Sequence, residues 1–192
     1  SNVPENTSVE ITVFSFFNEK NDEYNVRIDS SGRFRITMPV INTNAIFLYN
    51  QDCNLSMKII AEPGDTFFMF YNNDNKDARF MGQNSRLNQE LVNCNKNPSI
   101  KEFYKLNLSY EAKMDHDTYM VEQQKIYDKK MEILEEYISL HPQLSDKFKS
   151  YKRNSELMQH AIFLMQRRFI LRRNFNKESF SPKYMAYVDQ LY

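Results

Sequence analysis

The sequence has few of the residue types on which most catalytic and metal sites depend. Its 192 residues include only two Cys, three His and three Gly, and no Trp. These low numbers exclude most metal clusters, Gly-rich phosphate loops and CxxC redox motifs. The sequence therefore predicts no catalytic residue, no metal ligand and no cofactor-binding residue, and we expect a chain that is not an enzyme and holds no cofactor.

Excess charge and long apolar segments are lacking as well. Lys and Arg number 25, as do Asp and Glu, so the formal net charge is zero. No global attraction to nucleic acid follows from such a balance. No apolar run approaches the roughly 18 residues that a membrane span needs. Apolar residues still make up 41% of the chain, which is enough to build a core.

Alternating apolar and polar residues dominate the first part of the chain, which also holds all three glycines. Val9, Ile11 and Val13 share one face of a predicted strand. The turn residues 29–32 separate two further alternating runs, so residues 24–38 are predicted to form a β-hairpin. The predicted strands cover residues 9–14, 24–28, 33–38, 45–49, 55–61, 66–71 and 78–81. Their close spacing favours an antiparallel sandwich or an open barrel.

Helical periodicity replaces the alternation from about Gly82 onward. Asn84 or Ser85 is expected to cap a first helix, Ser99 a second one, and Asp115 or Asp117 a third. The next helix spans residues 145–174, with an apolar stripe of Met158, Ala161, Ile162, Met165 and Phe169. Ser181 and Pro182 open a last helix that runs to Tyr192 without a stop signal, so we expect the chain to be a piece of a longer protein.

The order of strands and then helices predicts an α+β fold. We expect an antiparallel β-sandwich-like domain over residues 1–82 and a helical region over residues 83–192. At least one helix should cover an edge or a face of the sheet, because a sandwich of this length buries little apolar area alone.

The sulfur and imidazole groups form no recognisable catalytic pattern. Cys53 and Cys94 are too far apart in sequence for a redox pair, and unpaired thiols are favoured over a structural disulfide. Asp115, His116 and Asp117 resemble a metal-binding fragment, but acidic residues are also expected at a helix start. His160 is interpreted as an ordinary surface or core residue, and His141 followed by Pro142 is expected to end the third helix. No Ser-His-Asp triad follows from the spacing.

A basic stripe lies near the end of the longest predicted helix. It consists of Arg167, Arg168, Arg172, Arg173 and Lys177. An anion-binding or partner-binding role remains open for it. We favour a solvated helix face, because cations are stabilised near a helix C-terminus and the chain has no net positive charge.

Three motifs occur in an order that resembles a known family. They are Gly32-Arg33-Phe34, Glu62-Pro63-Gly64-Asp65-Thr66 and the segment FMGQNSRLN at residues 80–88. In this order they resemble the N-terminal accessory domain of TlpA/ResA-type thiol–disulfide oxidoreductases of Bacteroidetes. The resemblance covers residues 9–92 and extends only loosely into the helical part. In that family the redox CxxC belongs to a downstream thioredoxin-like domain, which this sequence lacks.

The resemblance implies a non-catalytic piece of a redox protein in the periplasm or cell envelope. Its expected partners are proteins: its own downstream thioredoxin-like domain, a client protein, or a second copy of itself. A free-standing β-sandwich that binds glycans or peptides is the alternative, since the 12 Tyr and 15 Phe could include exposed aromatic platforms. Three or more coplanar exposed rings on the sheet would favour that alternative.

Overall fold

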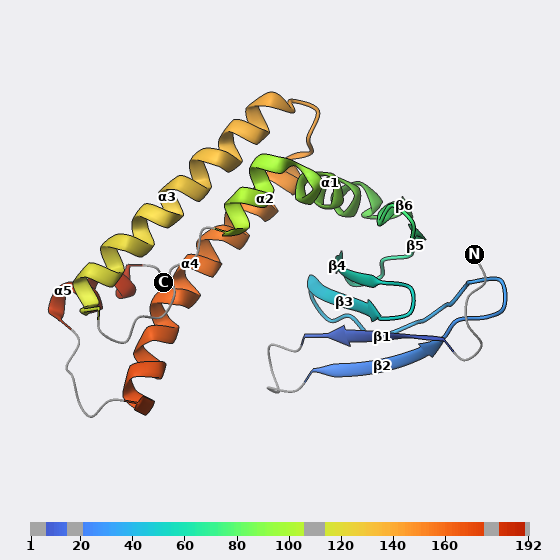
Figure 1. Ribbon diagram of the computed structural model, residues 1–192, viewed down its shortest axis with the longest axis horizontal. Coiled ribbons are helices and arrows are strands. Elements are labelled where there is room, and N and C mark those ends of the chain that lie inside the picture. Colours follow the sequence, from blue (N-terminus) through green and yellow to red (C-terminus); the bar gives the residue numbers. More distant parts are fainter. Residues whose placement is uncertain (1–6, 15–20, 106–113, 175–180, 191–192) are drawn as a thin grey trace. The chain divides into compact units, whose positions relative to one another are not determined.

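The computed structural model describes residues 7–14, 21–105, 114–174 and 181–190, and it confirms the α+β class (Figure 1). The side chains of Phe103, Tyr104, residues 168–174 and Val188 lie outside this description. Two compact units, Ser1–Val92 and Asn93–Tyr192, make up the chain. The strands are β1 (Ser8–Val13), β2 (Asp22–Arg27), β3 (Asn44–Asn50), β4 (Leu55–Ala61), β5 (Phe67–Asn72) and β6 (Asp77–Gly82). The helices are α1 (Ser85–Lys96), α2 (Pro98–Lys105), α3 (His116–Leu140), α4 (Asp146–Asn174) and α5 (Pro182–Asp189).

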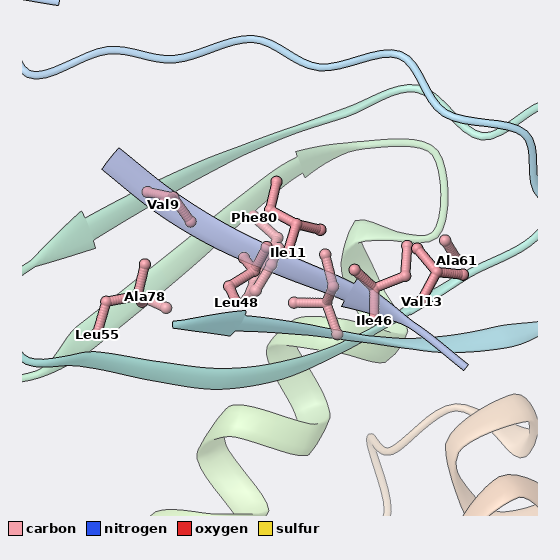
Figure 2. Packing of buried hydrophobic residues seen from close by; sticks show 10 residues of the cluster. Val9, Ile11, Val13, Ile46, Leu48, Leu55, Ala61, Ala78 and Phe80 are labelled. Carbon is pink, nitrogen blue, oxygen red and sulfur yellow. The ribbon is translucent and has the colours of Figure 1, made fainter. Parts of the chain in front are cut away.

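The first unit is built around a four-stranded antiparallel sheet in the order β2-β1-β3-β4 (Figure 1). The predicted alternation in β1 is confirmed, because Val9, Ile11 and Val13 are buried while Glu10 is exposed. The strands β5 and β6 form a separate antiparallel pair. Their Ala78 and Phe80 share one core with the sheet, as Figure 2 shows. The two layers make the unit sandwich-like, as predicted.

The predicted hairpin over residues 24–38 is wrong. Its turn is present, since Gly32 has φ 77° and Asp29 accepts hydrogen bonds from the amides of Ser31 and Arg33, each at 2.9 Å. However, β2 pairs with β1, and residues 33–41 carry no strand. Phe34, Ile36 and Met38 still pack against the core. Alternation therefore predicted the face of these residues correctly but not the partner strand, which depends on tertiary pairing.

The turn after β4 and the exit from β6 are tied together by side chains. Asp65 accepts a hydrogen bond from the amide of Glu62 at 2.7 Å, within the second sequence motif. Asn84 lies directly before α1, and its side-chain NH₂ donates to the Asp65 carboxylate at 2.7 Å. At Gly82, with φ 101°, an added Cβ would lie 2.7 Å from the Thr66 carbonyl oxygen. Gly82 is therefore required by both backbone conformation and space.

The helix α1 belongs to the sheet unit as far as Val92. Asn88, only 1% exposed, accepts from the Ile60 amide and donates to the Ile60 carbonyl, both at 2.8 Å. Gln89 bonds in the same way to the amide of Phe80 and the carbonyl of Ala78. These bonds satisfy backbone N–H and C=O groups of β4 and β6 that do not form hydrogen bonds with a neighbouring strand. A helix thus covers strand edges, as expected, and the division between units lies inside α1 rather than at residue 82.

In the second unit, the long helices α3 and α4 pack side by side and α5 contacts both (Figure 1). Asp115 is the N-cap of α3, accepting a hydrogen bond from the Thr118 amide at 2.9 Å, which confirms one of the two predicted caps. The prediction for α2 is wrong, because Asn97 rather than Ser99 accepts from the first amides of the helix. Pro98 is the first helical residue of α2, where its missing N–H costs nothing.

Only part of the predicted apolar stripe of α4 faces the core, since Met165 packs against the cluster of Tyr119, Met120, Leu164 and Tyr184. Met158 is 58% exposed and Ile162 is 41% exposed, while the side chain of Phe169 lies outside the described residues. The buried face of α4 instead carries a mixture of apolar and charged side chains, namely Phe148, Lys152, Glu156, His160, Leu164 and Arg167. Apolar periodicity did not reveal this buried face because three of its positions hold formally charged residues.

Candidate functional site

Four ionisable side chains meet in the interior of the helical unit, and we call them the buried polar cluster. They are Lys130 of α3 and Lys152, Glu156 and His160 of α4, each 4–7% exposed. The three residues of α4 follow one another at spacings of four, which places them on one face of the helix. Helical geometry therefore explains their alignment, and the packing of α3 on α4 explains their burial.

An ion pair forms the centre of this cluster. The Lys152 Nζ lies 3.0 Å from Glu156 Oε1, and the two side chains are 5% and 4% exposed. Burial lowers the pKa of Lys130, an effect that the nearby Glu156 opposes and Lys152 reinforces. One carboxylate thus interacts with two ammonium groups away from water. Such an arrangement is costly to desolvate and holds together only while all partners are present.

His160 joins the cluster to α5 through a chain of hydrogen bonds. Its ring stacks on Tyr127 with 4.7 Å between centroids, and its Nε2 lies 3.0 Å from the Tyr187 hydroxyl. The Tyr187 hydroxyl donates to the Gln124 amide oxygen, and the Gln124 NH₂ donates to Asp128 at 2.6 Å. The single hydroxyl proton of Tyr187 is donated to Gln124. The hydrogen bond between Tyr187 and His160 is therefore donated by the Nε2–H group of His160.

The electrostatics around His160 favour its neutral form. Burial lowers the pKa of His160, the carboxylate of Asp128 opposes this shift, and the Lys130 ammonium reinforces it. A hollow beside the ring is lined by Gln123, Ile126, Tyr127, Lys130, Glu156, Gln159, His160 and Phe163. Its volume is about 10 Å³, which is the space that a single water molecule needs. The hollow therefore suits a water molecule rather than an organic cofactor.

Arg167 is the only member of the predicted basic stripe whose side chain is described, and it is not solvated. It is 1% exposed, and its guanidinium carbon lies 4.1 Å from the centre of the Tyr119 ring. Arg167 also donates to the carbonyl of Met114 and, at 3.4 Å, to His116 Nδ1. The interpretation of Arg167 as part of a solvated face is thus wrong. The side chains of Arg168, Arg172 and Arg173, and all of Lys177, lie outside the described residues.

The side chains of Asp117 and His141 form contacts within the helical unit rather than a metal or catalytic site. Asp117 accepts a hydrogen bond from Ser181, next to α5, while His141 ends α3 with its Nδ1 2.7 Å from the Tyr137 carbonyl. Within the described residues, no three His, Cys, Asp or Glu side chains are grouped so that they could hold a metal ion. The same residues contain no helix of the length and apolarity needed to span a bilayer.

The two cysteines are free thiols in different environments. Cys53 is partly exposed after β3, and its amide donates to the Asn50 side chain at 2.5 Å. Cys94 is fully buried. Burial raises the pKa of Cys94 to about 11, with Glu156 adding to the effect and Lys152 opposing it. Because the thiolate is the nucleophile, Cys94 is poorly suited to thiol–disulfide exchange at neutral pH.

We expect the two thiols to react with an aromatic disulfide reagent at very different rates at pH 8. Cys53 should react within minutes, whereas Cys94 should react at least about a hundredfold more slowly, since both thiolate formation and access are suppressed. In urea sufficient to unfold the chain the two rates should converge. Cys53→Ser and Cys94→Ser variants assign the signals, and rapid reaction of Cys94 in the folded chain would contradict this prediction.

Sequence reasoning missed the buried polar cluster, although a signal for it was present. The residues Phe148, Lys152, Glu156, His160 and Leu164 form an uninterrupted row at spacings of four, with apolar residues at both ends. Comparisons of the chain with protein-family models, curated proteins and solved structures find no match. The resemblance to the thiol–disulfide oxidoreductase family therefore stays a prediction.

Proposed function

We propose that this chain is a non-catalytic accessory module of an extracytoplasmic thiol–disulfide oxidoreductase. In this proposal it binds the thioredoxin-like domain of the same protein and positions it. The order of the three sequence motifs supports the family, and the unreactive surroundings of Cys94 support a chain that leaves sulfur chemistry to another domain. The observation that carries the interaction role is an exposed apolar face on the β5–β6 pair.

This face, which we call the β5–β6 outer face, consists of Phe68, Phe70, Met81 and Arg79. Phe68 is 69% exposed, Phe70 is 60% exposed and Met81 is 60% exposed. Phe68 is paired with Met81 and Phe70 with Arg79 across the two strands, so the four side chains project from one surface. Exposed Phe, Met and Arg side chains are typical of protein–protein interfaces. A folded protein partner is therefore favoured as the occupant.

The glycan-binding alternative has weaker support. The exposed rings described on the four-stranded sheet and directly after β1 are Phe47, Tyr49 and Phe14, each 40–48% exposed. Phe14 and Phe47 meet at 74° with centroids 5.2 Å apart. An edge-to-face pair does not offer the coplanar platform on which a sugar ring stacks. Binding to a glycan array would nevertheless favour this alternative over the accessory role.

The first test of the proposal uses the sequence of the parent gene and an activity assay. A segment with a CxxC motif in a βαβ pattern is expected downstream of Tyr192, and the isolated chain should reduce insulin no faster than the buffer thiol does. A stop codon or an unrelated domain at that position would contradict the proposal. Insulin reduction by the isolated chain well above the buffer rate would do so too.

The second test examines the proposed interface directly. Isothermal titration of the chain with the separately expressed thioredoxin-like domain should show binding, and the variant Phe68→Ser/Phe70→Ser should weaken it at least about tenfold, because exposed aromatic anchors dominate such interfaces. Leu140→Ser is the matched control, since Leu140 is 69% exposed on α3. Equal weakening by the control, or no binding by the unmodified chain, would refute the interface.

A further inference from the structure

The helix α5 is held against α3 and α4 by three polar side chains. Ser181 donates to Asp117 of α3, and Tyr184 donates to the carbonyl of Leu164 on α4. The third, Tyr187, donates to Gln124 of α3 and accepts from His160 of α4. Of these three sets of hydrogen bonds, only the last includes a histidine, the side chain that changes its charge between pH 5 and pH 8. A second histidine, His116, contacts the Tyr184 ring at 5.6 Å between centroids.

The groups that face His160 come from all three helices. Tyr127, Asp128 and Lys130 come from α3. Glu156 comes from α4, one helical turn before His160. From α5 the Tyr187 ring stands nearly perpendicular to His160, at 83° and 6.2 Å. His160 is 4% exposed with α5 in place. A positive charge on this ring would thus be buried next to the Lys130 ammonium.

From this geometry we propose that His160 is a pH-sensitive latch that holds α5 in place while it is neutral and releases α5 when it becomes protonated. Withdrawal of Tyr187 removes one wall of the imidazole site and lets water solvate the ring. The imidazolium is therefore more stable with α5 released than with α5 docked. The released state therefore binds a proton more readily than the docked state. A fall in pH consequently shifts the equilibrium toward release of α5.

The direction of the pH dependence follows from the lowered pKa of docked His160. A solvated His has a pKa of about 6.5. Above that value both states are neutral and docking is at its strongest. As the pH falls below about 6.5, the released state binds a proton first, so docking weakens until the docked ring is protonated as well. One proton permits at most a tenfold change in the docking equilibrium for each pH unit.

Hydrogen exchange of the full chain tests this latch. Protection factors of the α5 amides, corrected for intrinsic exchange, should fall between pH 7.5 and pH 5.0 by up to tenfold per unit, while those in the middle of α3 stay constant. His160→Gln keeps a neutral N–H donor for Tyr187, so α5 protection in this variant should depend on pH much less than in the unmodified chain, while the His116–Tyr184 contact is retained. His141→Gln serves as the control and should respond like the unmodified chain.

An NMR titration of the His160 ring supplies the second measurement, which does not rely on a variant. Its midpoint should lie below 6.5, at the lower end of the pH range over which α5 protection is lost. Constant α5 protection in the unmodified chain would overturn the latch. So would an equal pH response in His160→Gln, or a parallel loss of protection in α3, which would indicate unfolding of the whole unit.

Discussion

The variant Glu156→Leu is expected to destabilise the helical unit by about 3–5 kcal/mol, because it leaves two buried ammonium groups without the carboxylate between them. Lys152 Nζ loses the Glu156 carboxylate at 3.0 Å. Lys130 loses its electrostatic attraction to the same carboxylate, which offsets part of the cost of burying its ammonium group. Neither side chain can reach water easily, since they are 4% and 7% exposed. Urea unfolding monitored by circular dichroism at pH 7.5 measures the change.

Removing all three charges should reverse this loss. In the triple variant Lys130→Met/Lys152→Met/Glu156→Leu, apolar side chains of similar length fill the same space without any desolvation cost. Replacement of buried charge clusters in this way is often neutral or stabilising by roughly 1–4 kcal/mol. If the triple variant is as unstable as Glu156→Leu, the loss comes from packing rather than from uncompensated charge.

A surface ion pair between the same two helices provides the matched control. Arg153 of α4 binds Glu135 of α3 through two hydrogen bonds of 2.6 Å, and both side chains are more than 40% exposed. Solvent screens this pair, so Glu135→Leu should cost less than about 1 kcal/mol. An equal effect of Glu135→Leu and Glu156→Leu would contradict the importance of burial. The comparison therefore isolates burial as the variable.

The buried charges also explain where the sequence predicts the fold and where it does not. Local signals were sufficient for the α+β class, the faces of β1, the cap at Asp115 and the turn at Gly32. Each of these depends on residues that are close in sequence. By contrast, the pairing of β2 with β1 depends on tertiary contacts, and alternation alone could not distinguish β1 from residues 33–38 as its partner.

The helical unit shows the same limit in its side chains. Hydropathy ranks Met158 and Ile162 above Lys152 and Glu156 as core residues, yet the structure exposes the former and buries the latter. Burial of Lys152 is possible only because Glu156 lies on the same face one turn later. The contribution of Lys130 comes from a different helix, so no local pattern could have placed it in the cluster.

Arg167 offers the second large effect, with an expected loss of about 2–4 kcal/mol for Arg167→Met. The methionine fills much of the same space, but the Met114 carbonyl loses its charged donor and Tyr119 loses the guanidinium stacked on its ring. Loss of a hydrogen bond from a charged donor costs roughly 1.5–3 kcal/mol, and a desolvated cation–π contact adds up to about 2 kcal/mol. Urea unfolding of the full chain measures the total.

The variant Arg167→Lys separates the charge from the geometry of the side chain. Lysine keeps the positive charge but has no planar fork that can stack on Tyr119 while it donates to both Met114 and His116. We therefore expect Arg167→Lys to lose at least half as much stability as Arg167→Met. Arg153→Lys, on the exposed face of α4, should change stability by less than about 0.5 kcal/mol. If both lysine variants are equally harmless, Arg167 is a solvated cation, and the contacts that link α4 to the start of α3 contribute nothing to the fold.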